Sequence, residues 1–193
     1  SMVHSETTPG ILNDIESVAR VVKANNRLFI VDAMSSFGGV EIPVESLGID
    51  FLVSSANKCI QGVPGFSFII ARKFVLLAAK GNARSLSLDL TAQYETLEKD
   101  HGKWRFTSPT HVVAAFDEAL RELKAEGGIA ARHARYAAVN EALREGMAEL
   151  GFKAYVAADR QGPFITTFLY PDQAGFDFKH MYAVLKAGGY VIY

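Results

Sequence analysis

Three short apolar runs constrain the fold of this chain more than any other feature. Leu28–Val31 is continuously apolar and rich in strand-forming residues, and Ile49–Val53 and Phe66–Ile70 are similar runs that each contain one polar residue. A strand that is apolar without alternation is buried on both faces, as in a parallel sheet covered by helices. Because helical or short segments separate these runs, we predict an α/β fold with a mainly parallel sheet.

Helical patterns flank and follow the predicted strands. Apolar residues recur at helical spacing from Leu12 to Val22, and Asn13 or Asp14 is suited to start that helix. The pattern from Leu90 to Leu150 is mostly helical as well. Such helices supply the layers that a buried parallel sheet requires.

The chain changes character at Gly127-Gly128, which separates two helical stripes. Beyond Gly151 the pattern predicts short strands at 152–156, 164–169 and 190–193 and a helix at 178–185. We therefore predict an α/β sheet domain over residues 1–127, followed by a smaller α+β domain over residues 128–193.

Composition excludes several classes of function. The chain carries 20 Lys and Arg against 21 Asp and Glu, so nothing in it attracts nucleic acid or an anionic membrane. A single cysteine, Cys59, excludes an internal disulfide framework and favours a reducing cytoplasm. The five histidines show no metal-ligand spacing, and we interpret them as surface or capping residues. No metal site is expected.

Two titratable residues stand where ligands bind in α/β proteins. Asp32 ends the first apolar run, and ligands bind at the carboxyl ends of strands in open α/β sheets. Taken alone, Asp32 could equally form a turn or cap a helix. The small, Gly-rich segment 33–39 after it would let a flat ligand approach the backbone.

Lys58 lies just beyond the second apolar run and before the turn Gly62-Val63-Pro64-Gly65. A surface loop lysine is the simpler interpretation of this position on spacing alone. A lysine buried beside an apolar strand would have a lowered pKa, as a nucleophilic lysine needs. Together, Lys58 and Asp32 match the needs of pyridoxal 5′-phosphate (PLP): a lysine for its aldehyde and a carboxylate for its ring nitrogen.

Four stretches make the sequence resemble the class V aminotransferases of the PLP fold-type I superfamily. They occur in the family's order and spacing, and the resemblance as a whole covers nearly all 193 residues. It implies that residues 1–127 are part of a PLP-binding large domain and residues 128–193 part of a smaller carboxyl-terminal domain. The stretches are His4-Ser5-Glu6-Thr7-Thr8-Pro9-Gly10, Val31-Asp32-Ala33-Met34-Ser35-Ser36-Phe37-Gly38-Gly39, Ser54-Ser55-Ala56-Asn57-Lys58-Cys59-Ile60-Gln61-Gly62-Val63-Pro64-Gly65-Phe66 and Arg105-Phe106-Thr107-Ser108-Pro109-Thr110-His111.

The resemblance implies roles for six residues. Lys58 would bind the cofactor and then shuttle the proton of the substrate carbon, and Asp32 would pair with the pyridine nitrogen. Thr7 would lie near the phenolic oxygen. The remaining roles are contact with the phosphate for Asn57, packing beside the ring for Met34, and contact with the neighbouring subunit's cofactor phosphate for Thr107. The last role implies a homodimer.

The resemblance also implies a reaction between a small-molecule amino donor and a 2-oxo acid. The wording of segments 32–38 and 56–59 favours the branch that transfers the amino group of 2-aminoethylphosphonate to pyruvate, giving phosphonoacetaldehyde and alanine. Another class V reaction, such as the alanine–glyoxylate type, is the alternative enzyme. The alternative that is not an enzyme is a catalytically silent module that serves only structure or dimerisation.

Both ends of the chain lead us to expect a piece of a longer protein. The first motif begins almost at once, and the chain stops within the last predicted strand. By resemblance, an amino-terminal segment would hold the phosphate-binding loop at a helix N-terminus and an aromatic residue that stacks on the ring. A carboxyl-terminal segment would hold the arginine that binds the substrate's carboxylate or phosphonate.

Overall fold

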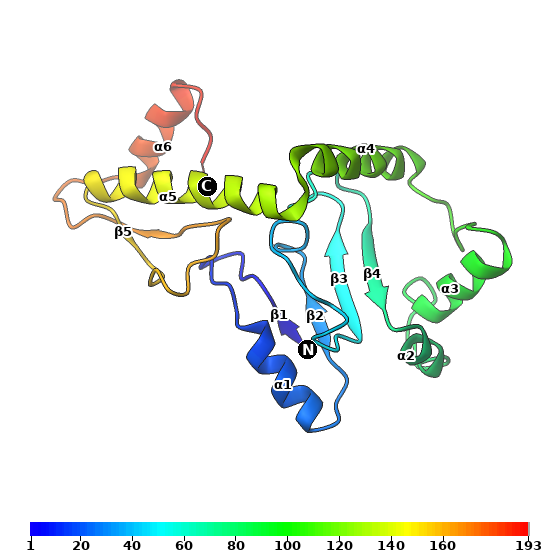
Figure 1. Cartoon of the computed structure of the whole chain (residues 1–193). Coiled ribbons are helices and arrows are strands. Elements are labelled where there is room, and N and C mark those ends of the chain that lie inside the picture. Colours follow the sequence, from blue (N-terminus) through cyan, green and yellow to red (C-terminus); the bar gives the residue numbers. More distant parts are fainter. Residues whose placement is uncertain (193) are drawn as a thin grey trace.

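A four-stranded sheet forms the first part of the protein in the computed structural model, which describes residues 1–192 (Figure 1). The strands lie in the order β1 (Met2–Val3), β2 (Ile30–Asp32), β3 (Phe51–Ser55) and β4 (Ser67–Ala71). β1, β2 and β3 are parallel, whereas β4 runs antiparallel to β3. The predicted α/β fold with a mainly parallel sheet is confirmed.

Two details of the sheet differ from expectation. β4 is antiparallel because a turn-rich connection without a helix joins it to β3, and parallel neighbours need a longer crossover. β1 was not predicted, since a two-residue strand is too short to show any period.

Helix α1 (Ile15–Ala24) covers one face of the sheet, as its apolar spacing predicts (Figure 1). The Asp14 carboxylate accepts a hydrogen bond from the Ser17 N–H at 2.9 Å and so caps the first turn. The buried side chains of helix and sheet form one core cluster, which comprises Ile15, Ala19, Phe29, Val31, Ala33, Ile49 and Leu52. Burial of this apolar surface fixes α1 against β2 and β3.

Helices α2 (Lys73–Ala78) and α3 (Leu90–Lys99) follow β4 and contact each other. The buried Thr91 hydroxyl donates to the Leu76 carbonyl at 3.0 Å and joins them. α2 was not predicted, because its apolar run is short and lacks an obvious helical stripe.

Helices α4 (Thr110–Glu126) and α5 (Gly128–Glu149) meet at Gly127, whose φ of 109° ends α4 in the left-handed region. α4 contributes the buried side chains Ala119 and Leu123 to a second core cluster, together with Ile60. In Figure 1, α4 lies across one end of the sheet and α5 continues toward the carboxyl-terminal part. The division into domains at residue 127 stays a prediction.

The carboxyl-terminal part holds less strand than predicted. β5 (Lys153–Ala154) and β6 (Phe168–Leu169) form a two-stranded antiparallel sheet, and α6 (Phe178–Ala187) is the expected helix. The strand predicted at 190–193 is wrong over 190–192, which follow the left-handed Gly189 and pair with no strand in the described chain. Its last residue, Tyr193, lies outside the described residues. No helix among residues 1–192 is long and apolar enough to cross a membrane.

Candidate active site

The carboxyl ends of the three parallel strands carry most of the predicted site residues. Asp32 closes β2, in register with Val3 of β1 and Val53 of β3. β1 leads directly into the Thr7 turn, and β3 leads into the turn that carries Lys58. Because parallel strands end at one edge of the sheet, these segments gather there.

Asp32 projects an exposed carboxylate from its strand end. Its Oδ1 accepts the N–H of Met34 at 2.9 Å, an interaction that shapes the following loop. Its Oδ2 makes no hydrogen bond or ion pair within residues 1–192. One oxygen therefore orients the carboxylate, and the other can accept a hydrogen bond from a ligand.

Lys58 lies in a closed turn. The Gln61 N–H donates to the Lys58 carbonyl at 2.8 Å, and the Gly62 N–H donates to the Ala56 carbonyl at 2.9 Å. The side chain of Lys58 itself is exposed and forms no ion pair with a described carboxylate. The side chain is therefore exposed, as the simpler interpretation from spacing alone predicted, and is not buried beside the apolar strand.

Thr7 joins the two strand ends. Its hydroxyl lies 3.0 Å from that of Ser35, in the loop after Asp32. Ser35 was not singled out from the sequence, and its only signal was a hydroxyl within the small, Gly-rich segment. Met34, beside it, and Asn57, beside Lys58, are both half-buried at this edge.

Thr107 is not brought to this cluster by the described contacts. It lies exposed in the loop between α3 and α4, and its hydroxyl makes no hydrogen bond within residues 1–192. Its contact with a neighbouring subunit stays a prediction.

His4 contacts Asp32 and the loop that follows it. The residue is 3% exposed, and its ring Nδ1 lies 3.0 Å from Ser36 Oγ. Its backbone N–H donates to the Asp32 carbonyl at 2.8 Å. Burial lowers the pKa of His4 below its ordinary value. The interpretation of His4 as a surface or capping histidine is therefore wrong, because the strand that precedes it went unrecognised.

Cys59 is the small buried residue that the sequence predicted. Its thiol donates to the Ser35 carbonyl at 3.5 Å and so links the Lys58 turn to the loop after β2. Burial raises the pKa of the Cys59 thiol to about 11, although the cations of Arg132 and Lys58 act in the opposite direction.

The donor set at this edge fits PLP. It offers an exposed amine on Lys58, a carboxylate with a free oxygen on Asp32, the Thr7 hydroxyl and the Asn57 amide. The buried Ser55 hydroxyl, three residues before Lys58, has no hydrogen-bond partner in the described part of the chain. A bound polar group or water satisfies such atoms in native proteins.

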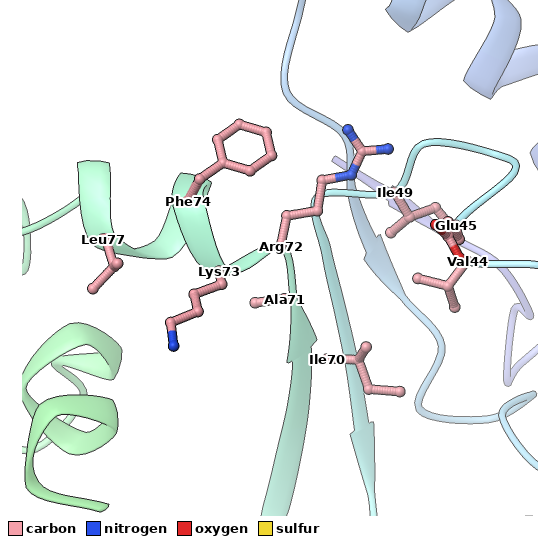
Figure 2. A pocket seen from close by; sticks show the side chains of 9 residues that line it. All are labelled: Val44, Glu45, Ile49, Ile70, Ala71, Arg72, Lys73, Phe74 and Leu77. Atoms are coloured by element: carbon pink, nitrogen blue, oxygen red, sulfur yellow. The ribbon is translucent and has the colours of Figure 1, made fainter. Parts of the chain in front are cut away.

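A mainly apolar groove lies away from these residues. A groove of about 840 Å³ opens where β3 begins and β4 ends, at the opposite edge of the sheet (Figure 2). Its lining residues are Val44, Glu45, Ile49, Ile70, Ala71, Arg72, Lys73, Phe74 and Leu77. Since this groove is mainly apolar and distant in register from Asp32, the chemistry of the strand ends identifies the site rather than cavity size.

Comparisons with known proteins agree with this geometry. The family model described as Aminotransferase class-V matches residues 1–186. A curated relative from Phocaeicola vulgatus, 2-aminoethylphosphonate–pyruvate transaminase, is 60% identical over all 193 residues, which span 53% of its length. A bifunctional phosphonoacetaldehyde hydrolase/aminoethylphosphonate transaminase from Clostridioides difficile is 58% identical over the whole chain, which spans 30% of that relative.

A solved structure shows the same fold. Alanine–glyoxylate aminotransferase from Nostoc sp. superposes with a TM-score of 0.81 at 26% identity, covering 95% of this chain and 48% of that one. The family match extends over nearly all of the sequence and includes both strand ends that carry Asp32 and Lys58. The chain therefore belongs to the class V aminotransferase family.

Proposed function

We propose that this chain supports PLP-dependent transfer of the amino group of 2-aminoethylphosphonate to pyruvate. The products are phosphonoacetaldehyde and alanine. The observation that carries the proposal is the placement of Asp32 at the carboxyl end of β2 and of Lys58 just beyond the carboxyl end of β3, its parallel neighbour. PLP, when bound, supplies an electron sink for the pair released at the substrate carbon.

Lys58 and Asp32 divide the work in this proposal. The Lys58 amine would hold PLP by its aldehyde group. Once released by substrate, the same amine would act as the base that removes the proton of the substrate carbon and as the acid that returns it. Asp32 Oδ2 would accept a hydrogen bond from the protonated ring nitrogen and so keep that nitrogen charged, while the Met34 N–H holds Oδ1.

The other predicted residues orient the cofactor. Thr7 would donate to the phenolic oxygen, supported by its contact with the Ser35 hydroxyl, and Met34 would pack beside the ring. Asn57 serves the phosphate from the residue before Lys58. We further propose a homodimer in which Thr107 reaches the phosphate at the neighbouring subunit's site, and a cytoplasmic location for the enzyme.

Identity favours this substrate pair over the alanine–glyoxylate reaction. The relative whose name includes 2-aminoethylphosphonate is 60% identical, whereas the solved alanine–glyoxylate enzyme is 26% identical. The C. difficile relative, by its name, joins the transaminase to a hydrolase of phosphonoacetaldehyde, the product proposed here. A fused activity that consumes this aldehyde fits a transamination that makes it.

A chimaera tests the proposal directly. The 193 residues replace the matching segment of the P. vulgatus relative, so that the rest of the cofactor and substrate site is supplied. We expect alanine to form from 2-aminoethylphosphonate and pyruvate, and borohydride to fix PLP to the peptide containing Lys58. Lys58→Ala should abolish the near-visible absorbance of lysine-bound PLP, whereas Lys124→Ala, an exposed lysine of α4, should leave it unchanged.

Three outcomes would contradict the proposal. Absorbance that persists in Lys58→Ala would remove that lysine from its role. A folded chimaera that prefers glyoxylate with alanine would favour the other class V reaction, and one that binds no PLP would favour a silent structural module.

A further inference from the structure

A buried arginine lies against the Lys58 turn. The side chain of Arg132, in the first part of α5, is only 2% exposed. Its Nη1 donates to the carbonyl oxygens of Cys59 at 2.9 Å and Ile60 at 3.2 Å. These are the two residues that follow Lys58, so the guanidinium binds the backbone of the lysine turn itself.

A carboxylate holds the guanidinium in this position. Glu126, the last residue of α4, accepts from Arg132 Nε at 2.8 Å and lies 2.7 Å from Nη2. Arg135 binds the other oxygen of Glu126 at 2.7 Å. Hydrogen bonds from Arg135 and then Arg132 lower the pKa of Glu126 to about 2. The buried cation is thus paired and hydrogen-bonded, as burial of a charge requires.

The turn that Arg132 binds is conformationally restricted. Gln61 has a φ of 65°, which is uncommon for a residue other than glycine, so surrounding contacts must hold it there. Its side-chain amide donates to Tyr136 Oη at 2.6 Å. Tyr136 follows Arg132 by one helical turn on α5, so one face of this helix binds the turn twice.

The same helix also reaches the carboxyl-terminal loop. Asn140 donates to Thr166 Oγ1 at 2.9 Å, and the nearby Gln161 side chain donates to the Gly10 carbonyl at 3.2 Å, beyond β1. α5 therefore contacts both the lysine turn and the carboxyl-terminal loop, and that loop contacts the segment after β1.

We propose that Arg132 is a positioning residue that fixes the turn carrying Lys58 and couples its placement to α5. Its significance for catalysis rests on the proposed role of Lys58. Its hydrogen bonds to the turn are independent of that role. Loss of the guanidinium frees the carbonyl oxygens of Cys59 and Ile60 and lets the restricted Gln61 relax. Lys58 then samples more orientations.

Amide hydrogen exchange in the 193-residue chain without cofactor tests whether Arg132 restrains the Lys58 turn. The reporters are the N–H groups of Gln61 and Gly62, which close the turn. Arg132→Gln should speed their exchange about tenfold or more. Arg132→Lys should rescue this only partly, because an ammonium cannot bind two carbonyls and Glu126 in the same planar geometry. The matched control is Arg144→Gln, on the same helix and without a hydrogen bond to the turn.

A milder variant distinguishes local loosening of the turn from general unfolding. Glu126→Gln keeps the guanidinium but weakens its anchor, so it should speed exchange in the same turn to a smaller extent. Amides of α1 and β2 report on the rest of the fold. Unchanged exchange at Gln61 and Gly62 in both variants overturns the proposal. A uniform increase across α1, β2 and the turn also overturns it, because it would mean a general structural role.

The chimaera then separates this inference from the proposed function. With PLP bound, Arg132→Gln should shift the pH midpoint of the near-visible absorbance and slow borohydride trapping at Lys58, and Arg132→Lys should restore part of both. An unshifted midpoint with unchanged trapping overturns the coupling to Lys58. If the unsubstituted chimaera never binds PLP at Lys58 while the turn still loosens in Arg132→Gln, the proposed function fails and the grip on the turn stands.

Discussion

The hydroxyl groups of Thr7 and Ser35 lie 3.0 Å apart, and this contact joins the turn after β1 to the loop after Asp32. The two segments are far apart in sequence but leave neighbouring parallel strands. Cys59 makes the corresponding link on the other side, from the Lys58 turn to the carbonyl of the same Ser35. Ser35 therefore lies between the segments that carry the proposed cofactor contacts.

Replacing Thr7 by Val should weaken PLP binding without unfolding the protein. Valine keeps the shape of the side chain and removes only the hydroxyl, whose net hydrogen-bond contribution is about 0.5–1.5 kcal/mol, or about twofold to tenfold in affinity. Titration of the chimaera with PLP measures this. Ser35→Ala should have part of the same effect, and the double variant should lose less than the sum of the two. Strict additivity would show that the two hydroxyls act independently.

Asp32→Asn should retain PLP but reduce turnover by about 100-fold or more. The amide oxygen can still accept the Met34 N–H, so the loop keeps its shape. It cannot hold a proton on the ring nitrogen as a carboxylate does. Alanine formation and the near-visible absorbance, measured side by side, separate chemistry from binding. Turnover near that of the unsubstituted protein would contradict the pairing of Asp32 with the ring.

The Cys59 thiol should be almost inert toward alkylation in the folded protein. With a pKa of about 11, about one thiol in a thousand is ionised at pH 8, and the side chain is buried. Iodoacetamide modification, followed by mass spectrometry, should be slow in buffer and fast in denaturant. Modification of the folded chain at the rate of an unstructured cysteine would show that the turn opens freely.

The sequence predicted those elements that have a distinctive local pattern, such as an apolar run or a capping residue. Apolar runs located β2, β3 and β4, and Asp14 was correctly proposed as one possible start of α1. The role of Arg132 left no such trace, because its partners Cys59 and Ile60 lie more than 70 residues away and a buried arginine looks like any charged helix residue. Pattern analysis detects periodicity along the chain, whereas this contact exists only after the chain has folded.

Asp50 should be the ionic group whose loss most destabilises the four-stranded sheet and the helix packed on it. Its carboxylate is 3% exposed, accepts the Phe29 N–H at 2.7 Å and binds Lys23 Nζ at 2.7 Å, with Arg72 farther off at 3.8 Å. Asp50→Ala would leave the buried Phe29 N–H unsatisfied, and we expect a loss of about 2–4 kcal/mol in the free energy of unfolding. Urea denaturation measures it. Lys23→Met, which removes a half-exposed partner, should cost less; the reverse order would contradict this assignment.

Acidification should destabilise the protein through His4. Burial lowers the pKa of His4 in the folded state, so below its ordinary pKa of 6.5 the unfolded chain binds the proton more readily. The free energy of unfolding should therefore fall as the pH drops below about 6.5, and this loss should level off below the folded-state pKa. His4→Gln can still bind Ser36 but does not titrate, so its stability should change less over this interval. The control is His101→Gln, at an exposed position. Urea midpoints between pH 8 and pH 5 give the comparison. Parallel pH profiles for the unsubstituted protein and His4→Gln would show that the histidine behind Asp32 takes up its proton without cost to the fold.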